Sequence, residues 1–289
     1  MPNRMDLHVP SEPDTAEIWA DQPRSEGGGR LYYFEQGKGP ALVLIHGVGL
    51  KAEAWGALIP ALSQTFRVIS VDMPGHGASP LCDAATLQDF VARFSDFLPG
   101  VGGPVGLVGH SMGGLLVNEL AARHPDKVLA IAALNTVYQR PAAATKAVQA
   151  RANALSAGGD QDPAATLTRW FGDAPQGHIR DCAEACRQWL TKGSVSGYAA
   201  AYRVFADTPG PSTDVLGRIA CPSLYITGAL DPNSTPEMTH ALAADTIEGT
   251  AAVIAGAAHM LPMTHSAEVA QLLTAFFEAQ FATHSQKGT

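Results

Sequence analysis

The serine in Gly109-His110-Ser111-Met112-Gly113 is the residue of this chain best suited to act as a nucleophile. Four residues typical of a buried strand lead into the motif, and a helical pattern follows it at once. A strand-to-helix turn this sharp strains the serine backbone, and the flanking glycines leave room for it. The hydroxyl should therefore project from the sheet beside a helix N-terminus, which favours negative charge. The alternative is a packing turn in which Ser111 only caps the helix.

A serine hydroxyl needs a base within hydrogen-bond reach and a carboxylate behind that base. Asp231 follows the apolar run 223–227, and His259 follows the run 251–255. Taken singly, Asp231 could cap the next helix and His259 could satisfy loop carbonyls. Together, each just past a strand and in the order Ser, Asp, His, they predict a catalytic triad. In this triad Ser111 attacks, His259 moves the proton and Asp231 orients the imidazole.

Two other polar residues near strand ends are weaker candidates for these roles. His76 lies in the glycine-rich loop 72–79, where a side chain that satisfies loop carbonyls is the favoured interpretation. Asn135 ends the apolar run 128–134, where an alternative acid would sit, but it carries no charge. Asp231 is therefore the better acid.

Acyl transfer also requires donors for the oxygen that becomes negative in the tetrahedral intermediate. The backbone N–H of Met112 is supplied by the nucleophile turn. The second donor is predicted to be the N–H of Val48, because the glycines in His46-Gly47-Val48-Gly49 let that backbone bend inward. The alternative for this loop is an ordinary strand-ending turn.

The elements that must position these groups alternate between strand and helix patterns. Strands are predicted near 30–35, 41–45, 67–72, 105–108, 128–134, 223–227 and 251–255, with helical patterns between most of them. This alternation predicts an α/β fold with a doubly wound, mostly parallel sheet. From 135 to about 217 only helical patterns appear. We therefore predict an N-terminal arm over 1–29, a core over 30–135 and 216–289, and a helical cap over 136–215.

The large aromatic residues of the predicted cap have two possible roles. Most should form the cap's own core, as aromatic residues at helical spacing usually do. Because a few should face the serine, Trp170, Trp189 and Tyr202 are predicted to bind substrate.

Composition excludes several classes of partner. The chain has 289 residues and a formal net charge of −8, which disfavours nucleic acid and anionic membranes. No apolar run is long enough to span a bilayer and no secretory signal pattern is present, so we predict a cytoplasmic protein. The four cysteines have no metal-binding spacing, and no metal or cofactor is predicted. A homodimer is left open.

Taken together, these motifs resemble those of the α/β-hydrolase family over roughly residues 30–285. The run Ser196-Gly197-Tyr198-Ala199-Ala200-Ala201-Tyr202 is similar to enol-lactonase-like and carboxylesterase members. The resemblance implies a metal-free serine hydrolase that cleaves a small carboxylic ester or lactone through an acyl-enzyme. Ser111 departs from members with an aspartate nucleophile, and Met260 departs from the tryptophan that often follows the histidine in C–C bond hydrolases. A C–C bond hydrolase and a non-catalytic, receptor-like binding protein remain the alternatives.

Overall fold

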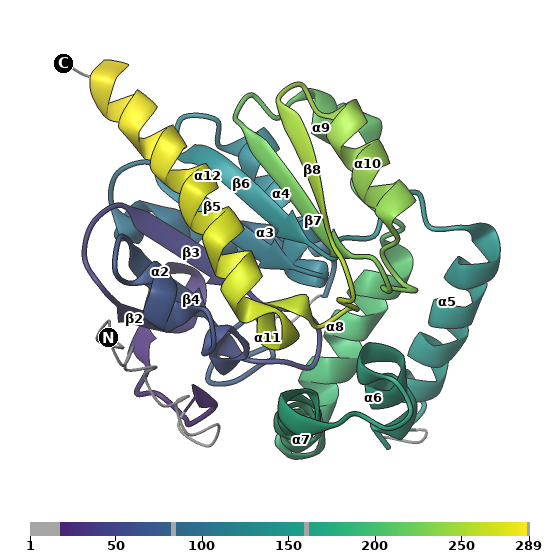
Figure 1. Cartoon of the computed structure of the whole chain (residues 1–289). Helices are drawn as coiled ribbons and strands as arrows, with labels where there is room; N and C mark the ends of the chain where they lie inside the picture. Colours follow the sequence, from purple (N-terminus) through teal and green to yellow (C-terminus); the bar gives the residue numbers. More distant parts are fainter. Residues whose placement is uncertain (1–17, 82–84, 159–161, 288–289) are drawn as a thin grey trace, which may run out of the picture.

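The computed structural model describes residues 18–81, 85–158 and 162–287, which form an α/β structure around one eight-stranded sheet (Figure 1). The strand order is β1-β2-β4-β3-β5-β6-β7-β8. β2 is antiparallel to β1 and β4, and all other neighbours are parallel. The strands are β1 (Ser25–Glu26), β2 (Tyr32–Gln36), β3 (Ala41–Ile45), β4 (Arg67–Val71), β5 (Val105–His110), β6 (Val128–Leu134), β7 (Ser223–Gly228) and β8 (Gly249–Ile254). The predicted mostly parallel sheet is confirmed.

Helices cover both faces of the sheet (Figure 1). One face packs against α3 (Leu87–Val101), α4 (Met112–Arg123), α9 (Thr213–Gly217) and α10 (Pro236–Asp245). The other packs against α2 (Ile59–Leu62), α11 (Leu261–Thr264) and α12 (Ser266–Lys287). Because both faces are covered, the central strands are apolar along their whole length and read as continuous hydrophobic runs. None of the described helices is long and apolar enough to cross a membrane.

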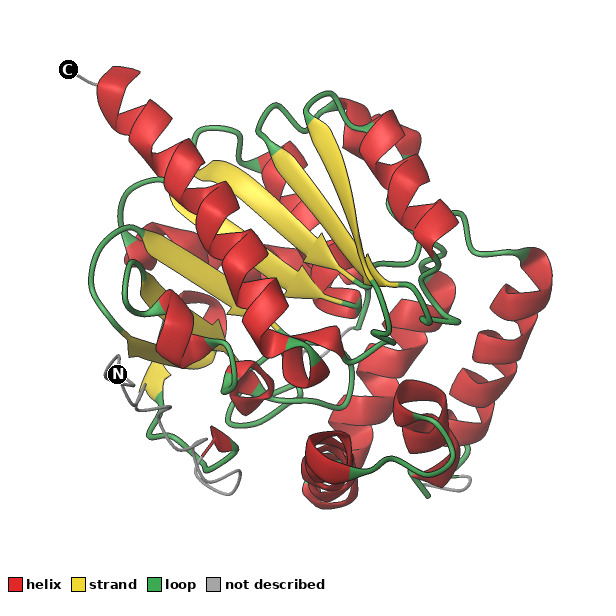
Figure 2. Cartoon of the chain, in the orientation of Figure 1, coloured by secondary structure: helices red, strands yellow, loops and turns green. Residues whose placement is uncertain are grey.

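Four helices between β6 and β7 lie beyond the carboxyl ends of the strands (Figure 2). They are α5 (Ala142–Ser156), α6 (Ala164–Phe171), α7 (Gly177–Lys192) and α8 (Val195–Asp207). This arrangement accords with a helical insertion over the catalytic edge, while the boundaries at 136 and 215 stay predictions.

The predicted N-terminal arm is described from residue 18 onward, and this part of it packs on the core. Ser25 and Glu26 pair with β2, and η1 (Gly28–Arg30) packs beside α3. The guanidinium of Arg24 binds the buried carboxylates of Glu53, in η2 (Ala52–Trp55), and Asp72. Residues 1–17 of the arm lie outside the described residues.

Candidate active site

The turn between β5 and α4 has the strained geometry that the sequence predicts. Ser111 has φ 55° and ψ −113°, a backbone conformation that residues other than glycine seldom adopt. A Cβ atom on Gly109 would lie 2.1 Å from the carbonyl oxygen of Gly113, and one on Gly113 would lie 2.0 Å from that of Ile45. Both glycines are therefore required for the turn.

Asp231 and His259 meet beyond the ends of β7 and β8. The Nδ1–H of His259 donates to Oδ2 of Asp231 at 2.8 Å, and both side chains are almost completely buried. Oδ1 of Asp231 accepts the backbone N–H of Asn233 at 2.8 Å. Burial alone would raise the pKa of Asp231, but His259 and the donated hydrogen bonds outweigh it and lower that pKa. The carboxylate is therefore charged and fixes the ring of His259.

Asn135 supports this carboxylate, which sequence reasoning missed. The amide nitrogen of Asn135 donates to Oδ2 of Asp231 at 2.8 Å, while its amide oxygen has no hydrogen-bond partner among the described residues. Asn135 is fully buried and has a positive φ of 50°. The signal in the sequence was an uncharged polar residue at the end of an apolar strand. It was considered only as a possible acid.

His110 supports the histidine from the other side. Its Nε2–H donates to the backbone carbonyl of His259 at 2.9 Å, and the two rings lie 5.2 Å apart. Burial, with a smaller contribution from His259, lowers the pKa of His110 to about 3, so this ring is neutral at ordinary pH. His110 therefore acts as a fixed donor to the loop that carries His259.

The predicted oxyanion donors lie at the same edge of the sheet. The backbone N–H groups of Val48 and Met112 have no acceptor among the described residues. A Cβ on Gly47 would lie 3.1 Å from Cβ of Ser111, so the loop passes close to the serine. Val48 also lines the cavity that contains Ser111. These positions are compatible with the predicted roles, which stay predictions.

Ser111 and His259 line one cavity of about 230 Å³ between the core and the cap helices. Trp170 and Tyr202 line the same cavity, as their predicted substrate-binding role requires. The ring of Trp170 lies 6.0 Å from that of His259 with an interplanar angle of 30°. The aromatic wall of the cavity therefore extends to the histidine itself.

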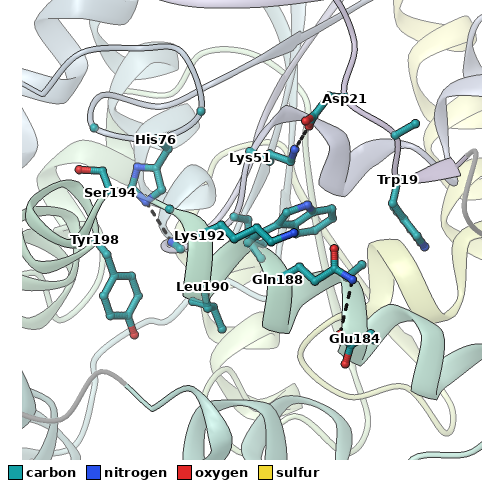
Figure 3. Close-up of a pocket in the computed structure, with 18 of the residues that line it drawn as sticks. Trp19, Asp21, Lys51, His76, Glu184, Gln188, Leu190, Lys192, Ser194 and Tyr198 are labelled. Atoms are coloured by element: carbon teal, nitrogen blue, oxygen red, sulfur yellow. Dashed lines mark hydrogen bonds and ion pairs between the residues drawn. The ribbon is translucent and has the colours of Figure 1, made fainter.

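Trp189 differs from the other two predicted substrate-binding residues, because it does not line the cavity that holds Ser111. Trp189 lines an outer cavity of about 720 Å³ between α7 and the segment that follows β3. Lys51 and Gln188, which line the same cavity, are labelled in Figure 3. There the ring of Trp189 packs edge-on against Trp19 at 6.0 Å, with the ammonium of Lys51 5.8 Å from its centroid. Sequence spacing does not reveal which neighbour a helix face meets, so the cavity that Trp189 lines could not be derived from the sequence. Its role in substrate binding stays a prediction.

Residues 42–272 match the alpha/beta hydrolase family. The chain belongs to this family. It is 45% identical to (E)-2-((N-methylformamido)methylene)succinate hydrolase of Acinetobacter baylyi over 249 residues, which cover 86% of this chain and 94% of that protein. The predicted fold is thus confirmed, and the chain is a hydrolase, so the receptor-like alternative is not retained.

Two solved structures are also similar to this α/β-hydrolase. A malate-bound esterase from Thermogutta terrifontis has a TM-score of 0.78 and 25% identity, covering 90% of this chain and 99% of that one. An enol-lactonase from Burkholderia xenovorans has a TM-score of 0.79 and 24% identity, covering 89% and 100%. The resemblance to esterase and enol-lactonase members is confirmed at the level of structure.

The cavity that holds Ser111, the candidate catalytic cavity, is lined by two arginines, a feature that the sequence patterns did not predict. Arg140 and Arg169 are among its lining residues, whereas no aspartate or glutamate of the described chain lines it. Arg140 donates to the carbonyls of Phe205 and Ala206 at the end of α8. Arg169 has neither an ion pair nor a hydrogen bond among the described residues. Burial lowers the pKa of Arg140 to about 10, which leaves it charged at neutral pH.

A third arginine lies behind the cavity wall. Arg151 donates to Oγ1 of Thr166 at 2.8 Å and to the hydroxyl of Tyr198 at 3.3 Å. Its guanidinium carbon lies 5.3 Å from the ring centroid of Tyr202. Its Nε is buried without a partner among the described residues. The cap therefore adds positive charge to a cavity that no aspartate or glutamate lines within residues 18–81, 85–158 and 162–287.

Proposed function

We propose that this chain is a serine hydrolase that cleaves a carboxylic ester or lactone through an acyl-enzyme. The observation that carries the proposal is the buried His259–Asp231 hydrogen bond of 2.8 Å beside the cavity that His259 shares with Ser111. A charged carboxylate on Nδ1 of the ring leaves Nε2 to accept a proton. The strained serine is the nucleophile that this base would serve.

The proposed reaction has two halves. Oγ of Ser111 attacks the carbonyl carbon as its proton passes to Nε2 of His259, and the N–H groups of Val48 and Met112 stabilise the resulting oxyanion. His259 then protonates the leaving alkoxide, which gives the acyl-enzyme. Water, deprotonated by the same ring, releases the carboxylic acid and restores the serine.

We infer that the substrate carries at least one carboxylate besides the bond that is cleaved. Arg169 offers a guanidinium that has no ion pair within the described part of the chain, and Arg140 and Arg151 add positive potential. Guanidinium groups bind carboxylates through paired hydrogen bonds, which are stronger than neutral ones. In a small, aromatic-walled cavity this contact would fix the orientation of a compact anionic substrate.

The relative from Acinetobacter baylyi favours a second candidate for the cleaved bond. Its name describes a succinate, with two carboxylates, joined to an N-methylformamido group. The same serine chemistry can cleave such an amide, and the cationic cavity suits a dicarboxylate. C–C bond hydrolysis, the other alternative, has no specific contact in its favour. Cytoplasmic location and a homodimer stay predictions.

Matched substrates and variants test the proposal. Fluorophosphonate should label the wild type but not Ser111→Ala, and the wild type should prefer p-nitrophenyl hemisuccinate to p-nitrophenyl acetate. Arg169→Met should lower kcat/KM for the hemisuccinate roughly 10- to 100-fold, as expected for a charged hydrogen bond, and barely change that for the acetate. Arg180→Met, an exposed arginine on α7, is the control. Equal losses for both esters would contradict the carboxylate contact.

The N-methylformamido compound named for the relative is assayed beside these esters. Release of formate that depends on Ser111 would favour the amide. Turnover of hemisuccinate without formate release would favour the ester or lactone.

A further inference from the structure

Two buried histidines join the loop that follows β3 to the loop that follows β4. Nε2 of His46, in the first loop, accepts the backbone N–H of Met73 at 3.0 Å. Nε2 of His76, in the second loop, accepts the backbone N–H of Gly49 at 3.0 Å. The rings lie 5.3 Å apart. Each loop thus supplies a ring that binds the backbone of the other, and we call this pair of contacts the histidine clasp.

The partners of each ring determine its protonation. Nδ1 of His46 faces the carbonyl of Gly47 at 2.8 Å, and Nδ1 of His76 faces that of Pro74 at 3.1 Å. A carbonyl can only accept and an amide N–H can only donate, so each ring must be neutral with its proton on Nδ1. An imidazolium would have no lone pair for the N–H of Gly49.

Burial supports this neutral state. It lowers the pKa of His46 to about 3 and that of His76 to about 4. The charged groups around the pair are Asp72, Arg24, Glu53 and Lys51, and they are bound to one another. Asp72 adds a second link between the loops, because Oδ1 accepts the N–H of Ala52 and Oδ2 that of Ala78.

The bond to Gly49 holds the residue that follows Val48. Gly49 has φ +79°, and a Cβ there would lie 2.5 Å from Cδ2 of Leu190, so this backbone is confined between cap and core. His76 lines the outer cavity (Figure 3) and is not among the residues that line the cavity of Ser111. The ring therefore supports the loop without lining the catalytic cavity.

We propose that His76 is a positioning residue of the reaction, which holds the N–H of Val48 in place for the oxyanion through its bond to Gly49. The inference rests on the proposed serine chemistry. Oxyanion donors act only when they point at the position of the developing charge. A displacement of about 1 Å can reduce the rate on the order of 10²-fold. His76 thus acts on the transition state through the loop rather than by proton transfer.

Three variants test this role. His76→Phe keeps a ring but cannot accept a hydrogen bond, whereas His76→Gln offers an oxygen to Gly49 and an N–H to Pro74. His124→Phe is the control, because this partly buried histidine lies at the end of α4 and binds Ser95. We expect His76→Phe to lower kcat on the order of 10²-fold with KM within about twofold. His76→Gln should recover most of the loss, and His124→Phe should change neither constant.

Two further measurements separate positioning from a loss of folded protein. Affinity for a trifluoromethyl ketone, which forms an oxyanion adduct with the serine, should fall in His76→Phe by the same factor as kcat. Amide hydrogen exchange over residues 47–51 should accelerate in His76→Phe and not in His124→Phe.

The proposal is overturned if His76→Phe keeps wild-type kcat, if ketone affinity is unchanged, or if exchange at 47–51 stays slow. The exchange measurement does not depend on turnover. If Ser111→Ala retained full activity, the proposed function would fail, while exchange would still show whether the clasp exists.

Discussion

The two sides of the catalytic cavity are held in different ways. On the core side, His259 and Asp231 are buried at strand ends, and Asn135 and His110 bond to them. On the cap side, Trp170 and the exposed Arg169 stand on the short helix α6. Buried hydrogen bonds hold the side chains of the core side in a fixed geometry, whereas the cap side contributes a charged and an aromatic side chain to the cavity. We therefore expect changes on the core side to affect the rate of any substrate, and changes on the cap side to affect which substrate is chosen.

Substitution of the proposed nucleophile should have the largest effect on kcat. If it did not, the contrast between the core side and the cap side would be wrong. Ser111→Ala is expected to lower kcat on the order of 10⁶-fold for every substrate, because the members of a triad act as a unit. The melting temperature should hardly change, since the turn glycines remain. His259→Ala should cost about as much. Retention of more than a tenth of wild-type kcat in Ser111→Ala would exclude this serine as the nucleophile.

Asp231→Asn tests the support of the base on the same side. The variant keeps the shape of the side chain but removes the charge that fixes the tautomer of His259, so kcat should fall about 10⁴-fold. Hydrolysis of p-nitrophenyl acetate and of hemisuccinate should fall by the same factor. A loss confined to one of the two esters would place Asp231 in substrate selection instead.

Acid should destabilise the core through its neutral histidines. The pKa is lowered to about 3 in His46 and His110 and to about 4 in His76, whereas an unfolded histidine titrates near 6.5. Between these values the unfolded chain binds more protons, so the free energy of unfolding falls as the pH falls below about 6.5. Each ring contributes about 1.4 kcal/mol per pH unit in this window.

Denaturant unfolding between about pH 6 and pH 5, below the unfolded pKa of histidine, measures this slope. His76→Gln should show a slope smaller by about 1.4 kcal/mol per pH unit than the wild type, because one titrating ring is removed. Parallel slopes would show that His76 is already solvated or charged in the folded protein. Asp72 and Asp231, whose pKa values are lowered, should add to the loss only at still lower pH, as their folded carboxylates protonate.

The contrast between the core side and the cap side also explains which residues could be predicted from the sequence. Ser111, Asp231 and His259 each follow a short apolar run, and parallel strands bring such positions to one edge. The fold and the candidate catalytic residues were therefore accessible from local patterns. Asn135 was noticed but misjudged, because its partner is 96 positions away and only the packed structure brings the two together.

Cap residues depend on contacts that no local pattern encodes. Trp170 and Trp189 lie on neighbouring helices with similar surroundings in the sequence, yet only Trp170 lines the cavity of Ser111. No role was predicted for the cap arginines, because only the packing of the cap helices places Arg140 and Arg169 at the cavity that holds Ser111. The proposed preference for a carboxylate was therefore not predicted, whereas the aromatic lining of the cap was.

The smallest expected effect compares these two tryptophans directly. Trp170→Ala enlarges the catalytic cavity beside His259, so the preferred acyl chain of p-nitrophenyl esters should become longer. One methylene in such a pocket is worth roughly 1 to 3 kcal/mol, so the change should be graded along the series. Trp189→Ala removes a ring from the outer cavity and should leave the chain-length profile of kcat/KM unchanged. If Trp189→Ala shifted the profile as much as Trp170→Ala, the two cavities would act as one site, and the division between a catalytic and an outer cavity would be wrong.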